Sequence, residues 1–228
     1  MRILAIDTAL SACSAGVLDS QAGLLGTESL PMERGQAEAL MPLIARVMDQ
    51  AETDFTDIDR IAVTVGPGSF TGLRVGIAAA RGIALAASRE AVGVSTLAAF
   101  AAPLIARDGA DVVIAAIDAR HGHLYMQVFG GPHRALRGGA YVDLATAKRA
   151  IDEAEGNVFL AGPAAEILAR LWPEDRPAPF VARAEAAPDI EWVARLGMVA
   201  DVETAPAKPL YLRPADARPQ DAARLPRQ

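Results

Sequence analysis

Short apolar runs alternate with stretches of helical periodicity along the chain. Apolar runs bounded by Gly, Pro or Asp are typical of buried strands, and apolar residues three or four apart are typical of amphipathic helices. Strands are predicted at 3–6, 13–18, 24–30, 61–65, 92–94, 112–117, 124–129, 157–160 and 180–182, and helices at 33–50, 72–87, 96–106, 146–154, 164–171 and 190–200. The alternation predicts an α/β fold with mixed sheets flanked by helices. Pro42 is expected to kink or interrupt its helix.

The stretch 61–87 combines a predicted strand, a turn and a helix in direct succession. Its β-branched start predicts a buried strand, and the following Gly-Pro-Gly predicts a turn that ends the strand. Ser69 or Thr71 can cap the helix that follows. Gly72, Gly76 and Ala80 recur every four residues and therefore share one helical face. That small-residue stripe either packs on the protein's own sheet or receives a partner helix.

Two matches indicate an internal repeat. AIDTALSACSAGVLD at 5–19 aligns with AIDARHGHLYMQVFG at 116–130, which places Asp7 opposite Asp118. VTVGPGSFTGL at 63–73 parallels VFLAGPAAEIL at 158–168. A duplicated α/β unit is therefore predicted, with an N-terminal lobe at 1–108, a C-terminal lobe at 109–212 and a tail at 213–228.

Composition narrows the class of protein. Apolar residues make up 52% of the chain and the formal net charge is −6, which argues against a surface that grips nucleic acid all over but leaves room for a local basic patch. The single cysteine, Cys13, excludes an internal disulfide and is expected to be a packed thiol. The apolar run in MRILAIDT is too short for a signal peptide, and Arg81 divides the longest apolar stretch, so no membrane span and a cytoplasmic location are expected.

Candidate chemistry rests on two aspartates. Asp7 and Asp118 could together hold Mg²⁺ and position a phosphoryl group, or each could end its strand by accepting nearby backbone N–H bonds. The hairpins that follow them carry alanines, a cysteine and bulky side chains instead of a Gly/Thr-rich phosphate loop. The GPGSFTG loop precedes a helix N-terminus but lacks the Gly-Lys-Ser/Thr of a Walker loop.

Metal and nucleophile motifs are missing from the sequence. The only histidines are His121, His123 and His133, with no H-x-x-x-H or H-E-x-x-H spacing, and no G-x-S-x-G elbow occurs. We therefore predict no metal site and no catalytic residue.

Together these features resemble a known family. Duplicated lobes with an aspartate at the first hairpin resemble the RNase H-like lobes of the actin, sugar kinase and Hsp70 ATPase superfamily. ILAIDTALSACSAGVL, GPGSFTGLRVGIAAARGIALA, VGVSTLAAFA, AAIDARHGHLY and PLYLR are similar to the TsaB (YeaZ) family of bacterial tRNA threonylcarbamoyladenosine biosynthesis proteins. This resemblance covers almost the whole chain.

The resemblance implies a non-catalytic scaffold in the synthesis of N6-threonylcarbamoyladenosine at tRNA position 37. Such a subunit would dimerise with TsaD, help recruit the ATPase TsaE, meet tRNA through the complex and form a homodimer when alone. It would hold no cofactor, apart from weak nucleotide binding within the complex. The implied partner face comprises Leu40, Leu43, Ile44, Val47, Gly72, Arg74, Val75, Gly76, Ala79, Ala80 and Ile83. The alternatives are an ATP-binding small-molecule kinase or ATPase that uses Asp7 and Asp118, and a self-sufficient homodimer.

Overall fold

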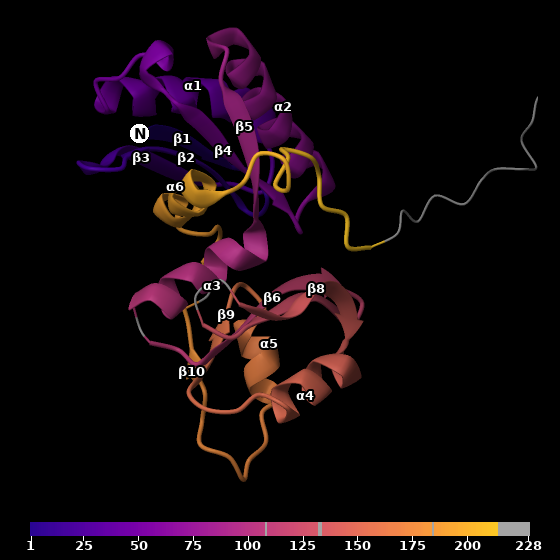
Figure 1. Cartoon of the computed structure of the whole chain (residues 1–228). Coiled ribbons are helices and arrows are strands. Elements are labelled where there is room, and N and C mark those ends of the chain that lie inside the picture. Colours follow the sequence, from indigo (N-terminus) through magenta and orange to yellow (C-terminus); the bar gives the residue numbers. More distant parts are fainter. Residues whose placement is uncertain (108, 132–133, 184, 214–228) are drawn as a thin grey trace, which may run out of the picture.

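A computed structural model describes residues 1–107, 109–131, 134–183 and 185–213 of the chain. The predicted tail beyond Arg213, and His133 of the three histidines, lie outside this range. The described residues form two five-stranded mixed sheets, one above the other in Figure 1. The fold class predicted from the sequence pattern is confirmed.

The first sheet has the strand order β3-β2-β1-β4-β5. Its strands are β1 (Arg2–Asp7), β2 (Ala12–Asp19), β3 (Gly23–Pro31), β4 (Arg60–Gly66) and β5 (Glu90–Ser95). The first three strands pair antiparallel, whereas β4 and β5 run parallel to β1. Apart from Arg2 and Arg60 at their starts, β1 and β4 are buried along their whole length, as expected for central strands covered on both faces.

The second sheet repeats this order strand for strand. Its order is β8-β7-β6-β9-β10, with the same two antiparallel and two parallel pairings. The strands are β6 (Val112–Arg120), β7 (His123–Phe129), β8 (Ala135–Asp143), β9 (Val158–Ala161) and β10 (Phe180–Val181). Asp7 and Asp118 lie at equivalent places on β1 and β6, so the structure contains the predicted repeat.

Helices occupy equivalent connections in the two halves. They are α1 (Gln36–Gln50), α2 (Phe70–Ala87), α3 (Thr96–Arg107), α4 (Leu144–Asp152), α5 (Ala165–Arg170) and α6 (Ile190–Val199), with a 3₁₀ turn at Phe55–Asp57. Helix α1 starts three residues later than predicted, after Gly35 in the left-handed region, and it continues through Pro42 without the predicted interruption. Pro42 lies on the exposed side of the helix, where water can satisfy the carbonyl that loses its bond.

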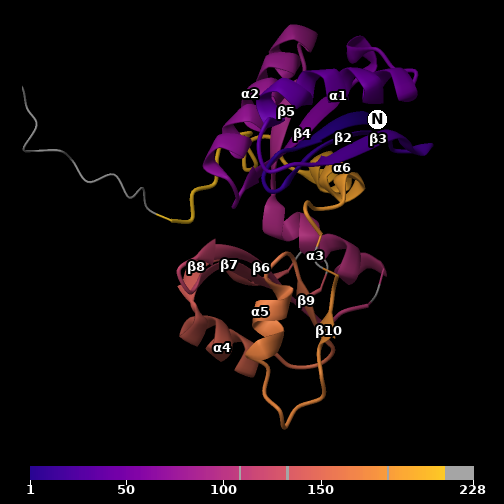
Figure 2. The same cartoon turned by 180° about the vertical axis from the view of Figure 1, so that it is seen from behind.

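The last helix of each half packs on the sheet of the other half. Helices α1 and α2 cover one face of the first sheet, and α6 covers the opposite face (Figures 1 and 2). Helix α3 covers the second sheet and touches α6 between the two sheets. The buried cluster under α6 includes Ile3, Ala62, Ile190 and Val193, so the first lobe is completed by residues far along the chain.

The segment after α6 stays on the first lobe. Gly93 donates its backbone N–H to the Ala205 carbonyl at 2.8 Å, and Leu210 donates to the Val65 carbonyl at 2.7 Å. The chain therefore lies along β5 and the end of β4 as far as Leu210, so this part of the predicted C-terminal lobe packs on the first lobe.

Helix α2 satisfies the length and hydropathy criteria of a membrane span. In the structure, however, it packs against β4 and β5, with Ser69 accepting the Gly72 N–H at its start. A core helix of an α/β lobe meets the same criteria, and no other helix among the described residues does.

A pair of Gly→Ala variants tests the packing of α6. A Cβ at Gly197 would lie 2.3 Å from the Ala62 Cβ, whereas a Cβ at Gly82 in α2 meets nothing within 4 Å. Gly197→Ala is expected to lower the free energy of unfolding by about 1–3 kcal/mol through overpacking. Gly82→Ala, the matched control, is expected to raise it by up to about 1 kcal/mol through helix propensity. Urea denaturation measures both, and a stabilised Gly197→Ala protein would contradict the packing.

Candidate functional site

Asp7 ends β1 inside the first lobe. Its side chain is fully buried, and its Oδ1 accepts hydrogen bonds from Thr64 Oγ1 at 2.5 Å and from the Ala9 N–H at 3.2 Å. The other oxygen, Oδ2, is buried with no hydrogen-bond partner among the described residues. Burial raises the pKa of the Asp7 carboxyl from 3.8 to about 6, and the two hydrogen bonds oppose that rise.

Asp118 has a different environment. It is exposed, and its Oδ1 accepts the Arg120 N–H at 2.7 Å. It lines a cavity of about 660 Å³ between the lobes, together with Gly68, Ser69 and Arg120, whereas Asp7 does not line it. The structure therefore does not place both carboxylates on one cavity wall. Each instead bonds the backbone N–H two residues ahead, which is the strand-end alternative considered from the sequence.

The loop after β1 packs against the N-terminus of α2, and residues of both line the cavity between the lobes. Ser69 donates its backbone N–H to the Ala9 carbonyl at 2.7 Å, and Thr8 Oγ1 donates to the Gly72 carbonyl at 2.7 Å. Backbone N–H groups at a helix start bind phosphate only when they are open to the ligand. Here the Ser69 N–H is bonded to the Ala9 carbonyl and the Gly72 N–H to Ser69 Oγ, so two N–H groups of the helix start are already engaged within the chain.

The same contacts explain the small-residue stripe of α2. A Cβ at Gly72 would lie 2.1 Å from the Thr8 carbonyl oxygen, and one at Gly76 would lie 2.4 Å from Thr8 Oγ1. Ala80 is fully buried in the core under α1 and α2. These residues allow the protein's own loop and sheet to approach the helix, so the predicted partner groove along them is wrong.

Most of the other predicted partner residues are also buried in the first lobe. Of the predicted partner residues, Arg74 is exposed to solvent, and Val75 and Ala79 are partly exposed. The buried members, all in the core cluster between α1, α2 and the sheet, are Leu40, Leu43, Ile44, Val47 and Ile83. The apolar side of α1 is thus buried against the first sheet of the same chain.

The outer side of α1 and α2 presents a different set of apolar residues. Leu85 is 83% exposed and Met41 is 48% exposed, and Ala45, Ala78 and Gly82 are also exposed. We call these five residues the outer α1/α2 face. Sequence reasoning missed them, although Leu85 could have been noticed as a large apolar residue outside the buried stripe of its helix.

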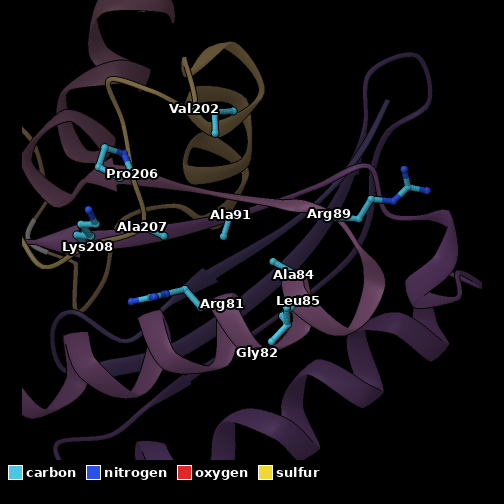
Figure 3. Close-up of a pocket in the computed structure, with 10 residues that line it drawn as sticks. All are labelled: Arg81, Gly82, Ala84, Leu85, Arg89, Ala91, Val202, Pro206, Ala207 and Lys208. Carbon is cyan, nitrogen blue, oxygen red and sulfur yellow. The ribbon is translucent and has the colours of Figure 1, made fainter.

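Beside Leu85, a groove of about 540 Å³ separates α2 from the segment after α6. Its floor contains Ala84 and Ala91, and Figure 3 shows Arg81 pointing along it to the side where Lys208 lies. Arg89 points the other way and donates to the Thr56 carbonyl at 3.1 Å. The edge of the outer α1/α2 face is therefore cationic.

The candidate nucleophile and metal ligands do not form a site. Cys13 is buried, as predicted, and burial raises the pKa of its thiol to about 11, with the Asp7 and Glu28 carboxylates adding to the rise. Among the residues that the structure describes, no three His, Cys, Asp or Glu side chains gather as a metal site would require.

The duplicated sheets and their helices define the class: an α/β protein with the fold of the actin-like and sugar kinase ATPases. A ROK hexokinase from Thermus thermophilus shares this fold, with a TM-score of 0.50 at 17% identity over 87% of this chain and 99% of that one. Residues 31–182 match the TsaD family model, described as tRNA N6-adenosine threonylcarbamoyltransferase, and the chain belongs to this family.

Within the family the chain is similar to TsaB and YeaZ. It is 43% identical over 125 residues to the tRNA threonylcarbamoyladenosine biosynthesis protein TsaB of Escherichia coli, covering 55% of this chain and 53% of that protein. The chain thus spans about half the length of the curated relatives it matches first. YeaZ from Pseudomonas aeruginosa superposes with a TM-score of 0.75 at 29% identity over 92% of this chain and 99% of that one. The resemblance predicted from the GPGSFTGLR block is confirmed.

The buried carboxyl of Asp7 predicts a pH-dependent stability. The pKa of Asp7 is about 6 in the folded protein and 3.8 when the side chain is exposed. Protonation of Asp7 therefore contributes its full share to the free energy of unfolding below about pH 4, and this contribution is lost as the pH rises through 6. Asp7→Asn keeps the shape without the charge. It is expected to match the parent protein near pH 4 and to exceed it by about 2–3 kcal/mol at pH 8.

Denaturant titrations at both pH values measure the effect. Asp118→Asn, at the equivalent and exposed position of the second lobe, is the matched control. A difference between Asp7→Asn and the parent that is the same at pH 4 and pH 8 would show that Asp7 does not titrate as described.

Proposed function

We propose that the chain is a non-catalytic scaffold of the complex that forms N6-threonylcarbamoyladenosine at position 37 of tRNA. It would pair with TsaD, help recruit TsaE and work in the cytoplasm. The observation that carries the proposal is the separation of the two aspartates: Asp7 is fully buried away from the cavity that Asp118 lines, and the Ser69 N–H at the start of α2 is bonded to the Ala9 carbonyl. A fold of ATPases without an open phosphate cradle suits a binding role better than phosphoryl transfer.

The docking surface in this proposal is the outer α1/α2 face. Leu85 and Met41 provide exposed apolar side chains, while Ala45, Ala78 and Gly82 are small enough to let a second helix pair approach. Two copies of one fold that meet through the same helix pair form a four-helix interface of pseudo-twofold symmetry. Arg81 at the cationic edge would face acidic side chains of the partner.

The proposal includes no resident cofactor. Nucleotide would bind weakly, and only within the complex, because the Ser69 N–H at the start of α2 is already bonded to the Ala9 carbonyl and Asp7 is buried. Calorimetric titration of the isolated chain with Mg-ATP tests this point and the rival kinase function. Micromolar binding with turnover would favour the kinase, and an absence of heat would favour the scaffold.

A charge on the outer α1/α2 face should prevent assembly. Leu85→Glu is expected to weaken the complex with the TsaD protein of the same organism at least tenfold, because a carboxylate would be buried in an apolar interface. Size-exclusion chromatography and calorimetry of the mixed proteins measure the loss.

The matched control is Val199→Glu, which changes another strongly exposed aliphatic side chain, 70% exposed, at the end of α6. Both variants should keep the parent's thermal stability. Equal complex formation by Leu85→Glu and the parent would rule out this face. A Leu85→Glu protein that forms homodimers as readily as the parent would exclude the face as the homodimer surface as well.

A further inference from the structure

Residues 210–213 connect two aromatic clusters on opposite lobes. The yellow segment that carries them leaves the first lobe above the edge of the second lobe where β8 lies (Figures 1 and 2). Tyr211 stacks on Phe70 at the start of α2, with ring centroids 5.7 Å apart and planes at 29°. Arg74 lies over the Phe70 ring at 3.7 Å from its centroid and donates from Nε to Tyr211 Oη at 3.4 Å.

The second cluster surrounds Tyr141 on β8. His123 stacks on the Tyr141 ring at 4.6 Å with nearly parallel planes, and Tyr125 lies tilted at 5.7 Å. Arg213 places its guanidinium 5.4 Å from the centroid of the same ring. Two residues of one short segment, Tyr211 and Arg213, thus reach an aromatic ring on each lobe.

Cavities join these clusters into one strip. A small cavity of about 40 Å³ has Pro67, Tyr125 and Tyr211 on its wall. It shares Gly68 and Tyr125 with the larger cavity between the lobes, where Arg120 lies. We define the aromatic strip as Phe70, Arg74, Arg120, His123, Tyr125, Tyr141, Tyr211 and Arg213.

The composition of the strip stands out from the rest of the chain. Aromatic residues make up only 5% of the sequence, yet all three tyrosines lie in the strip. Phe70 and Tyr211 are 55% and 51% exposed, although burial is the usual way to stabilise a large aromatic ring. Three arginines accompany the rings in a chain whose net charge is −6.

We propose that the aromatic strip binds unpaired nucleotides of the tRNA substrate. Proteins that hold single-stranded RNA stack the bases on aromatic rings and guanidinium planes and neutralise the phosphates with arginine. The exposed rings of Phe70 and Tyr211 provide the stacking surface, and Arg74, Arg120 and Arg213 provide the phosphate contacts. This inference rests on the proposed function, because it takes the substrate from the tRNA-modifying complex.

Charge also sets the extent of the strip. The larger cavity has three acidic side chains, Glu33, Asp118 and Glu185, against the two arginines Arg34 and Arg120. Carboxylates there would repel phosphates, so the RNA path would follow the rings and end near Arg120. A protein partner would instead be expected over an apolar centre, such as the outer α1/α2 face.

The test measures RNA binding by the full chain, alone and mixed with TsaD. The probe is a fluorescent RNA hairpin with the anticodon loop of an ANN-decoding tRNA, followed by anisotropy. Tyr211→Ala is expected to raise Kd about tenfold, and Tyr211→Phe to leave it unchanged, because the ring alone stacks. Arg213→Ala is expected to reduce the salt dependence of binding by about one phosphate contact.

The matched control is Phe180→Ala on β10, the edge strand of the second sheet. This substitution also removes an aromatic ring that is 52% exposed and that contacts another ring, Phe159, with the centroids 4.7 Å apart. It should leave Kd unchanged, and thermal melts should show all variants folded. Equal Kd values for Tyr211→Ala and the parent would overturn the inference, as would equal losses for Tyr211→Ala and Phe180→Ala.

TsaD coelution separates this inference from the proposed function. Tyr211→Ala that still coelutes with TsaD but binds RNA weakly supports the strip as an RNA site. If the Tyr211→Ala protein no longer coelutes with TsaD but keeps the parent's Kd for RNA, the strip is a protein contact and the inference is refuted. A parent chain that binds the hairpin but never TsaD would remove the scaffold proposal and leave the RNA site standing.

Discussion

The exchange of helices between the two lobes is the interaction on which the structure depends. The first sheet has α1 and α2 on one face, and among the described residues α6 provides most of the cover of the other face, to which α3 adds Ala99. Ile190, Val193 and Ala194 bury that face, and Gly197 lets the helix come within contact distance of Ala62. Because α3 does the same for the second sheet, neither half can bury both faces of its sheet with its own consecutive helices. Each lobe therefore depends on the other to bury its sheet.

The closure between the β1 loop and α2 links packing to function. The residues that allow it, Gly72 and Gly76, are needed because Thr8 lies directly against the helix. The closure seals Asp7 in a site without water contact, where an ionised carboxylate is costly. In a phosphate-binding relative of this fold the corresponding space must stay open for the ligand. In this chain Thr8 packs against α2 at this place, and Asp7 does not reach the cavity between the lobes.

Much of the fold could be predicted from the sequence, because apolar runs and helical spacing report burial directly. Strand β8 was missed because it is an edge strand with Arg137, Gly138 and Gly139 in place of alternating apolar residues. The stripe of Gly72, Gly76 and Ala80 was misassigned to a partner surface because small residues serve a close internal contact and an external one equally well. The exposure of Leu85 and the meeting of Tyr211 with Phe70 depend on tertiary packing, which no local pattern encodes.

The late position of α6 has a consequence for synthesis on the ribosome. The ten residues of α6 begin at Ile190, so the five strands of the first sheet emerge long before their cover. During translation, the apolar underside of that sheet remains uncovered while the whole second lobe is made. A nascent chain in this state exposes Ile3, Ala62 and Val92, and it is the kind of intermediate that chaperones bind. The first lobe thus becomes fully covered only after the second lobe has been synthesised, although its own strands are made first.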